Sequence, residues 1–152
     1  MNIVYNKDIT EEQLELFKLM EEFVYTNLKD KSIFYKTTIH FTEVEDKCNG
    51  LSYIGSCTFR PSKPYEPIIK VSDYAIRLSS NAYKLSGNKL SNSYEKYRLK
   101  IIFHELAHVV VTFNDAELFH IMTMDNDDHF DKGEEDNVNI LADEFLKLKQ
   151  LI

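Results

Sequence analysis

The sequence is poor in the residues that build flexible linkers and disulfide frameworks. Only 4 glycines and 3 prolines occur among 152 residues, so no long flexible linker is expected. The two cysteines, Cys48 and Cys57, are too few for a disulfide scaffold, and both fall in one predicted strand-turn-strand region. We therefore interpret them as two small, partly buried residues rather than as a disulfide.

Basic residues and long apolar runs are also scarce. The chain has 18 Lys and Arg against 25 Asp and Glu, a formal net charge of −7. This balance disfavours nucleic-acid binding as the main activity, because that binding depends on Lys and Arg displacing counterions from phosphates. No apolar run has the length of a signal peptide or of a membrane span. We therefore expect a cytoplasmic protein without a membrane partner.

One domain over residues 1–152 is expected, because this length is near the commonest domain size and 43% of the residues are hydrophobic. Thr10-Glu11-Glu12-Gln13 fits a capping box at the start of a helix. Apolar periodicity then predicts strands over 36–44, over 51–59 and from 67 towards 78, and helices over 93–113 and 133–150. The pattern predicts an α+β fold with an N-terminal helix, a short three-stranded sheet, a central helix and a C-terminal helix.

The segment His104-Glu105-Leu106-Ala107-His108 carries the strongest chemical signal. His104 and His108 are four residues apart on a predicted helix, so both imidazoles lie on one face and can bind a single metal ion, for which zinc is the preferred candidate. Glu105 points about 100° away around the helix and can reach a metal-bound water. Its carboxylate is expected to take the proton as that water attacks a peptide carbonyl. The segment also lies in a helix rich in apolar residues, where burying its charges is costly unless a metal compensates.

A catalytic zinc ion needs a third protein ligand and one open position. Glu135 is our first candidate, because it continues the apolar stripe of the C-terminal helix and should point into the core. His129 is the main rival, since imidazole is an equally good ligand. Asp143 and Glu134 are further carboxylate candidates.

Two other features are less informative. The acidic run 125–131 is similar to a calcium loop, but Phe130 occupies the place where an EF-hand needs glycine, so we interpret the run as a solvated loop. Tyr83, Tyr94 and Tyr97 could each donate a hydrogen bond to an oxyanion, and the sequence selects none of them.

With these residues, the chain resembles a minimal metallopeptidase of the gluzincin type, in the zincin class. The order of elements, with a strand over Ile68–Leu78 ahead of the HExxH helix, is similar to that of SprT-like metallopeptidases. In that family the third ligand is a His followed by Gly, whereas Phe130 follows His129 here.

The last predicted helix resembles that of ImmA/IrrE-like metallopeptidases through Ala142-Asp143-Glu144-Phe145. A ligand Glu stands three residues before the Ala in that family, and this chain has Asn139 there. Both resemblances imply a zincin fold and a peptidase with Glu105 as general base.

The expected function is that of a zinc metalloendopeptidase acting on a protein or peptide, with Zn²⁺ held by His104, His108 and Glu135. Because a sheet edge beside the metal can bind substrate in extended form, Ile68–Leu78 is the candidate edge. The alternative is an inactive zincin-fold binding module with a structural metal, a hypothesis motivated by Asn139. A third, weaker hypothesis is a toxin or effector protease with one narrow target.

Overall fold

The computed structural model describes residues 1–44, 46–48, 51–78, 94–124 and 132–152. Its main sheet has four strands in the order β1-β2-β6-β5: β1 (Asn2–Val4), β2 (Thr38–Thr42), β6 (Lys63–Ser72) and β5 (Gly55–Arg60). The β1–β2 and β2–β6 pairs are parallel, whereas β5 runs antiparallel to β6. A separate hairpin joins β3 (Asp46–Cys48) to β4 (Leu51–Tyr53). Strand β5 therefore forms one edge of the mixed sheet.

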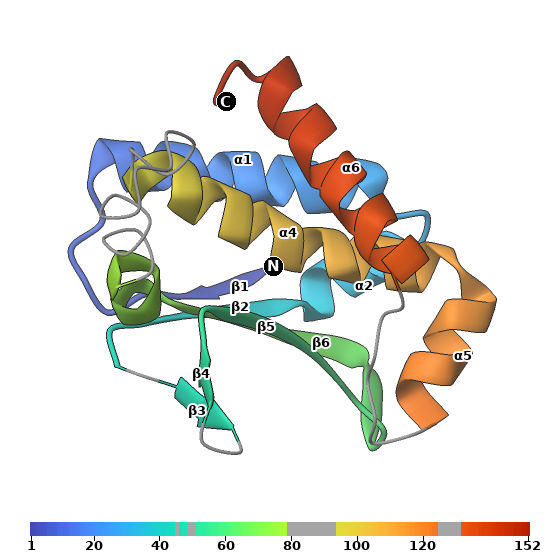
Figure 1. Cartoon of the computed structure of the whole chain (residues 1–152). Helices are drawn as coiled ribbons and strands as arrows, with labels where there is room; N and C mark the ends of the chain where they lie inside the picture. Colours follow the sequence, from blue (N-terminus) through green and yellow to red (C-terminus); the bar gives the residue numbers. More distant parts are fainter. Residues whose placement is uncertain (45, 49–50, 79–93, 125–131) are drawn as a thin grey trace.

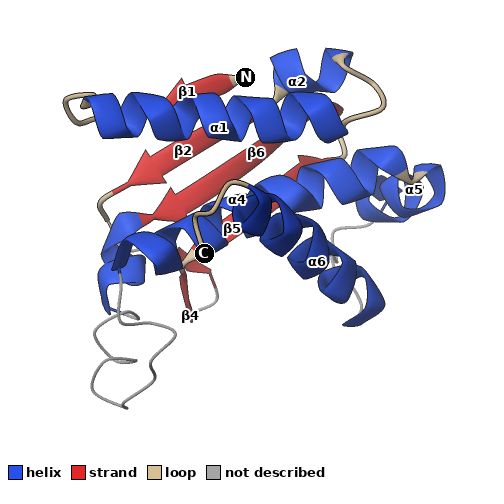
Figure 2. Ribbon diagram, turned by 90° about the horizontal axis from the view of Figure 1, so that it is seen from above, coloured by secondary structure: helices blue, strands red, loops and turns tan. Residues whose placement is uncertain are grey.

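Helices cover one face of this sheet (Figures 1 and 2). The helices in the described part of the chain are α1 (Glu11–Asn27), α2 (Ser32–Lys36), a helical turn over residues 73–78, α4 (Tyr94–Asn114), α5 (Ala116–Met124) and α6 (Lys132–Leu148). Both views show α1 and α4 lying over the strands and α6 crossing α4. None of the helices in the described ranges is long and apolar enough to cross a membrane.

Local sequence explains the start of α1 and the pleat of β2. The Thr10 hydroxyl accepts a hydrogen bond from the backbone N–H of Gln13 at 3.2 Å, which confirms Thr10 as the cap. The other half of the predicted capping box is missing, because Gln13 Oε1 has no hydrogen-bond partner among the described residues. In β2, Ile39 and Phe41 are buried beneath the helices while the alternate residues stay half-buried. The period of two therefore predicts the buried face of this strand correctly.

The core lies between the sheet and the helices, and aromatic side chains join three of those helices. Phe23 of α1 meets Phe103 of α4 edge to face, with ring centroids 5.4 Å apart. Phe103 in turn stacks on Phe145 of α6 at 5.3 Å. Both Phe23 and Phe103 are fully buried. This packing fixes α6 against the central helix α4, and edge-to-face and stacked ring pairs add to the burial energy.

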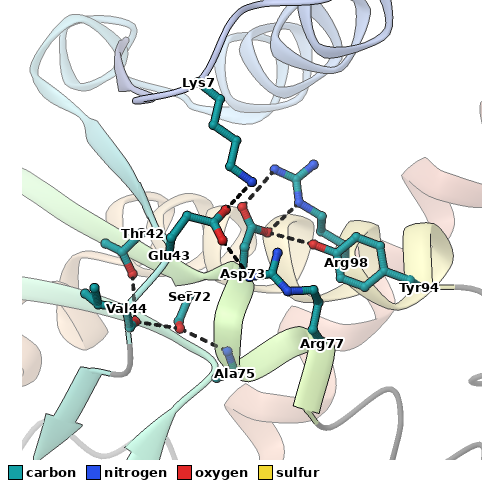
Figure 3. Close-up of polar contacts among 10 residues, drawn as sticks. All are labelled: Lys7, Thr42, Glu43, Val44, Ser72, Asp73, Ala75, Arg77, Tyr94 and Arg98. Atoms are coloured by element: carbon teal, nitrogen blue, oxygen red, sulfur yellow. Dashed lines mark hydrogen bonds and ion pairs between the residues drawn. The ribbon is translucent and has the colours of Figure 1, made fainter.

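A buried ion pair anchors the first turns of α4 to the end of β6 (Figure 3). Arg98 Nε lies 2.7 Å from Asp73 Oδ1, and the Tyr94 hydroxyl donates to the same oxygen at 3.2 Å. Asp73 and Arg98 are 4% and 8% exposed, so little water reaches them and each buried charge needs the other as its partner. The Tyr94 hydroxyl is thus held by Asp73, and burial followed by the Asp73 charge raises the pKa of Tyr94 to about 12.

Four details of the predicted fold are wrong. The main sheet has four strands rather than three, because the short strand β1 pairs with β2. The predicted strand 51–59 is divided at Ile54 into β4 and β5. Two short helices, α2 and α5, were not expected.

The fourth error concerns Ile68–Leu78. Strand β6 ends at Ser72, whose hydroxyl accepts from the N–H of Ala75 at 3.2 Å and so starts the helical turn 73–78. Because β6 lies between β2 and β5, it cannot offer a free edge to a substrate. The edge strand on this side is β5.

Candidate metal centre

Helix α4 brings two imidazoles together one turn apart. The rings of His104 and His108 are 4.7 Å apart between centroids and nearly perpendicular, at 86°. Their Nε2 atoms are separated by 3.1 Å. His108 is buried and His104 half-buried, because α4 is the central helix and this face of it lies under α6. The i, i+4 spacing thus produces the predicted pair.

Glu135, from the first turn of α6, faces this pair. Glu135 Oε2 lies 3.4 Å from His104 Nε2, and Glu135 Oε1 lies 3.4 Å from His108 Nε2. Glu135 is placed there because Val138, Ala142 and Leu146 on the same side of α6 are buried in the core. The potential ligand atoms of the three residues all lie within 4.8 Å of one another. The structure therefore brings together the three residues predicted as metal ligands.

The donor set fits a zinc ion. Two ligand atoms at about 2.0–2.1 Å from a tetrahedral zinc ion are roughly 3.3–3.4 Å apart. Here the two Nε2 atoms are 3.1 Å apart, and each lies 3.4 Å from a different oxygen of Glu135, which is close to this spacing. Burial, followed by the neighbouring His104, lowers the pKa of His108 to about 3. His108 is therefore neutral near pH 7, the form in which imidazole binds a metal.

Asn139 contacts the Nδ1 side of the His104 ring, a role that the sequence did not reveal. Its Oδ1 lies 2.8 Å from His104 Nδ1. Because an amide oxygen only accepts hydrogen bonds, this contact places the proton on Nδ1 and leaves the Nε2 lone pair facing Glu135. Asn139 stands one turn after Glu135 on α6. That i+4 spacing was the signal available in the sequence.

Glu105, the predicted general base, is buried between α4 and the edge strand. It is 8% exposed, and a Cβ atom added to Gly55 at the start of β5 would lie 3.2 Å from its Oε1. Burial, followed by the charge of Glu135, raises the pKa of Glu105 to about 8. An ionisable group shifted in this direction beside potential metal ligands is suited to exchanging protons near neutral pH.

A cleft of about 440 Å³ opens beside this centre. The edge strand, α4 and α6 each contribute to its walls, and the residues that line it are Ile54, Gly55, Lys100, Ile101, His104, Glu105, Asn139, Ala142 and Asp143. Since His104 and Glu105 both face it, the cleft offers space for a ligand next to the candidate metal centre.

The other candidate residues lie elsewhere or outside the described ranges. Among the residues that the structure describes, Asp143 and Glu134 are not part of the three-residue group, although Asp143 lines the cleft. Tyr97 packs against the hydrophobic core. His129, the acidic run 125–131 and Tyr83 fall outside the described residues.

Comparison of the chain with protein-family models, with curated proteins and with solved structures finds no match. The resemblance to SprT-like and ImmA/IrrE-like metallopeptidases therefore stays a prediction that rests on the HExxH motif and the order of elements. The candidate centre has to be judged on its own geometry.

Proposed function

We propose that this protein is a zinc-dependent endopeptidase whose metal ligands are His104, His108 and Glu135. The observation that carries the proposal is the convergence of two imidazole nitrogens and a carboxylate at the separations expected for ligands of one zinc ion. Three protein ligands leave one position of a tetrahedral ion open, as hydrolysis requires. The cleft beside His104 and Glu105 provides access to that position.

In this proposal Glu105 is the general base. Bound zinc would supply Lewis acidity, which lowers the pKa of water towards about 7 and polarises a peptide carbonyl. Glu105 accepts the proton of the attacking water and delivers it to the departing amine nitrogen. Its position one residue after His104 aims the carboxylate at the cleft side of the centre rather than at the ligand side.

The edge strand β5 is suited to holding an extended peptide across the centre. Ser72 N–H donates to the Ile54 carbonyl at 2.9 Å, and Gly55 pairs with Val71 in register. In an antiparallel ladder, this flanking bond means that the N–H and C=O of Gly55 itself point away from β6. A substrate strand could add to these groups by main-chain hydrogen bonding.

The experiment measures zinc content and hydrolysis of labelled casein by the purified protein. We expect about one zinc per chain, which His108→Ala loses. Glu105→Gln should keep the zinc and reduce the rate at least about 100-fold, the usual contribution of a general base. A Glu105→Gln variant that still hydrolysed casein at the wild-type rate would refute the base assignment.

The alternative proposal, an inactive binding module with a structural metal, predicts a different result of the same experiment. Wild-type protein would then hold zinc tightly and hydrolyse no casein, with a fourth protein ligand in place of the open position. Protein that binds no zinc would contradict both proposals.

A further inference from the structure

We propose that Gly55 is a positioning residue for Glu105: the bare backbone of the edge strand at this residue forms the wall that sets where the base carboxylate lies. The catalytic meaning of this inference rests on the proposed function. The contact itself does not, because it is a packing relation between β5 and α4.

The approach of β5 to Glu105 leaves no room for a side chain at residue 55. A Cβ atom added to Gly55 would lie 2.9 Å from Glu105 Cγ and 3.2 Å from Glu105 Oε1. It would also lie 3.1 Å from Ile101 Cγ2, one turn earlier on α4. A distance of 2.9 Å between two carbon atoms is well inside their optimal separation of about 3.5–4.0 Å. An alanine at this position therefore forces something to move.

The strand backbone cannot easily retreat from this contact. Gly55 pairs with the fully buried Val71, and the hydrogen bond from Ser72 to Ile54 holds the residue just before it. Moving Gly55 outward would break the start of the β5–β6 ladder. The side chain of Glu105, which has three rotatable bonds, is the part that gives way.

Glu105 also lacks other means of orientation among the described residues. No hydrogen bond or ion pair joins it to a neighbour in the described part of the chain, although it is 8% exposed. Among the described residues, packing rather than a hydrogen bond therefore holds its rotamer, and a Cβ atom at residue 55 would meet both its Cγ and its carboxylate. A displacement of about 1 Å in a catalytic group can reduce the rate about 100-fold.

The first test is a double-mutant cycle on stability in metal-free protein. Melting temperatures are measured for wild type, Gly55→Ala, Glu105→Ala and the double variant in the presence of a chelator. Gly55→Ala should lower the melting temperature of the protein with Glu105 by several degrees. It should lower that of Glu105→Ala clearly less, because the contacts with Glu105 Cγ and Oε1 are then gone and only the one with Ile101 Cγ2, at 3.1 Å, remains.

Equal shifts in both backgrounds would overturn the inference, since the missing side chain at residue 55 would then have nothing to do with Glu105. If Gly55→Ala does not fold, folding of the double variant supports the inference and failure of both overturns it. No zinc or substrate enters this cycle. Failure of the proposed function, seen as absence of zinc binding or of casein hydrolysis, is thus distinguishable from failure of the contact.

The second test separates positioning from general damage. Gly55→Ala should bind zinc within about twofold of the wild-type affinity, because the atoms nearest to a Cβ at residue 55 belong to Glu105 and Ile101 rather than to a proposed ligand. Its rate on labelled casein per bound zinc should fall at least about 10-fold. Thr38→Ala, on strand β2, serves as the control and should change neither quantity. A Gly55→Ala variant with an unchanged rate, or one that loses zinc and rate together, would contradict the positioning role.

Discussion

At the scale of single residues, the candidate site depends on a small number of contacts that give each histidine a defined role. Asn139 accepts a hydrogen bond from His104 Nδ1 at 2.8 Å, and Glu135 Oε2 lies 3.4 Å from His104 Nε2, where a shared metal ion would join the two. The i, i+4 spacing predicted the pair of His104 and His108, and the apolar stripe of the last helix placed Glu135 first among four candidates for the third ligand. The role of Asn139 was not predicted, although its i+4 spacing from Glu135 places both on one side of the last helix, because the sequence does not show how the His104 ring is oriented.

Asn139→Ala should weaken zinc binding about 10- to 100-fold, because the residues that orient metal-binding histidines typically contribute this much. The affinity is measured by competition with a chelator of known strength. Asn139→Asp keeps an acceptor oxygen and should retain most of the affinity. Asp143→Ala is the matched control, one turn further along α6 in the same cleft. If Asn139→Ala and Asp143→Ala bind zinc equally well, the hydrogen bond to His104 has no such role.

The raised pKa of Glu105 predicts a pH dependence of stability in the metal-free protein. The pKa is about 8 in the folded state and about 4.3 in the unfolded chain. Below about pH 4 the carboxyl group is protonated in both states, so its burial does not lower the stability of the folded state through ionisation. As the pH rises from about 4 to 8 the unfolded state releases its proton first, so the folded state loses stability, and above about pH 8 this loss is complete.

Glu105→Gln removes this ionisable group, so it should gain stability over wild type as the pH rises. We expect the difference between the two proteins to grow by at least about 1 kcal/mol from pH 5 to pH 8, since a tenfold change in acidity corresponds to about 1.4 kcal/mol. Urea unfolding of both proteins at the two pH values, with a chelator present, measures it. A constant difference would mean that ionisation of Glu105 carries no penalty.

At the scale of the elements, periodic signals predicted the long helices and strand β2 well, but they carried β6 past its end at Ser72. The bounds of α4 and α6 differ from the predicted helices by no more than two residues at each end. The three-residue strand β1 is too short to show a period, and it exists because β2 offers it a partner. Which strand lies at the edge depends on pairing across the chain, so β5 could not be distinguished from β6 by sequence alone.

The ion pair between Asp73 and Arg98 should be the most costly polar contact to break between elements. Asp73→Ala leaves a buried guanidinium without its partner, which typically costs about 3–5 kcal/mol. The double variant Asp73→Ala with Arg98→Met should recover much of this loss, because no buried charge then remains. Urea unfolding of the single and double variants measures both effects. If Asp73→Ala were as stable as wild type, the Arg98 guanidinium would have to be hydrated without any loss in the free energy of unfolding.

At the scale of the whole molecule, the candidate ligands come from two helices that the fold brings together from distant parts of the chain. His104 and His108 belong to α4, and Glu135 belongs to α6, whose buried side packs across α4 next to Phe103 and Phe145. A zinc ion bound by all three would therefore link α6 to α4 and the sheet beneath it. Zinc binding and global stability should then be coupled, because the unfolded chain does not hold the three ligands together.

This coupling predicts that zinc raises the stability of the wild-type protein by about 2.7 kcal/mol when free zinc exceeds its dissociation constant 100-fold. Glu135→Ala should lose most of this gain, since it removes the ligand that joins α6 to the histidines. Glu134→Ala, which changes the neighbouring carboxylate, should keep it. Thermal unfolding with and without zinc measures the gain, and hydrogen exchange should show the added protection in the first turns of α6. If His108→Ala kept the full gain, the zinc ion would be bound somewhere other than between these two helices.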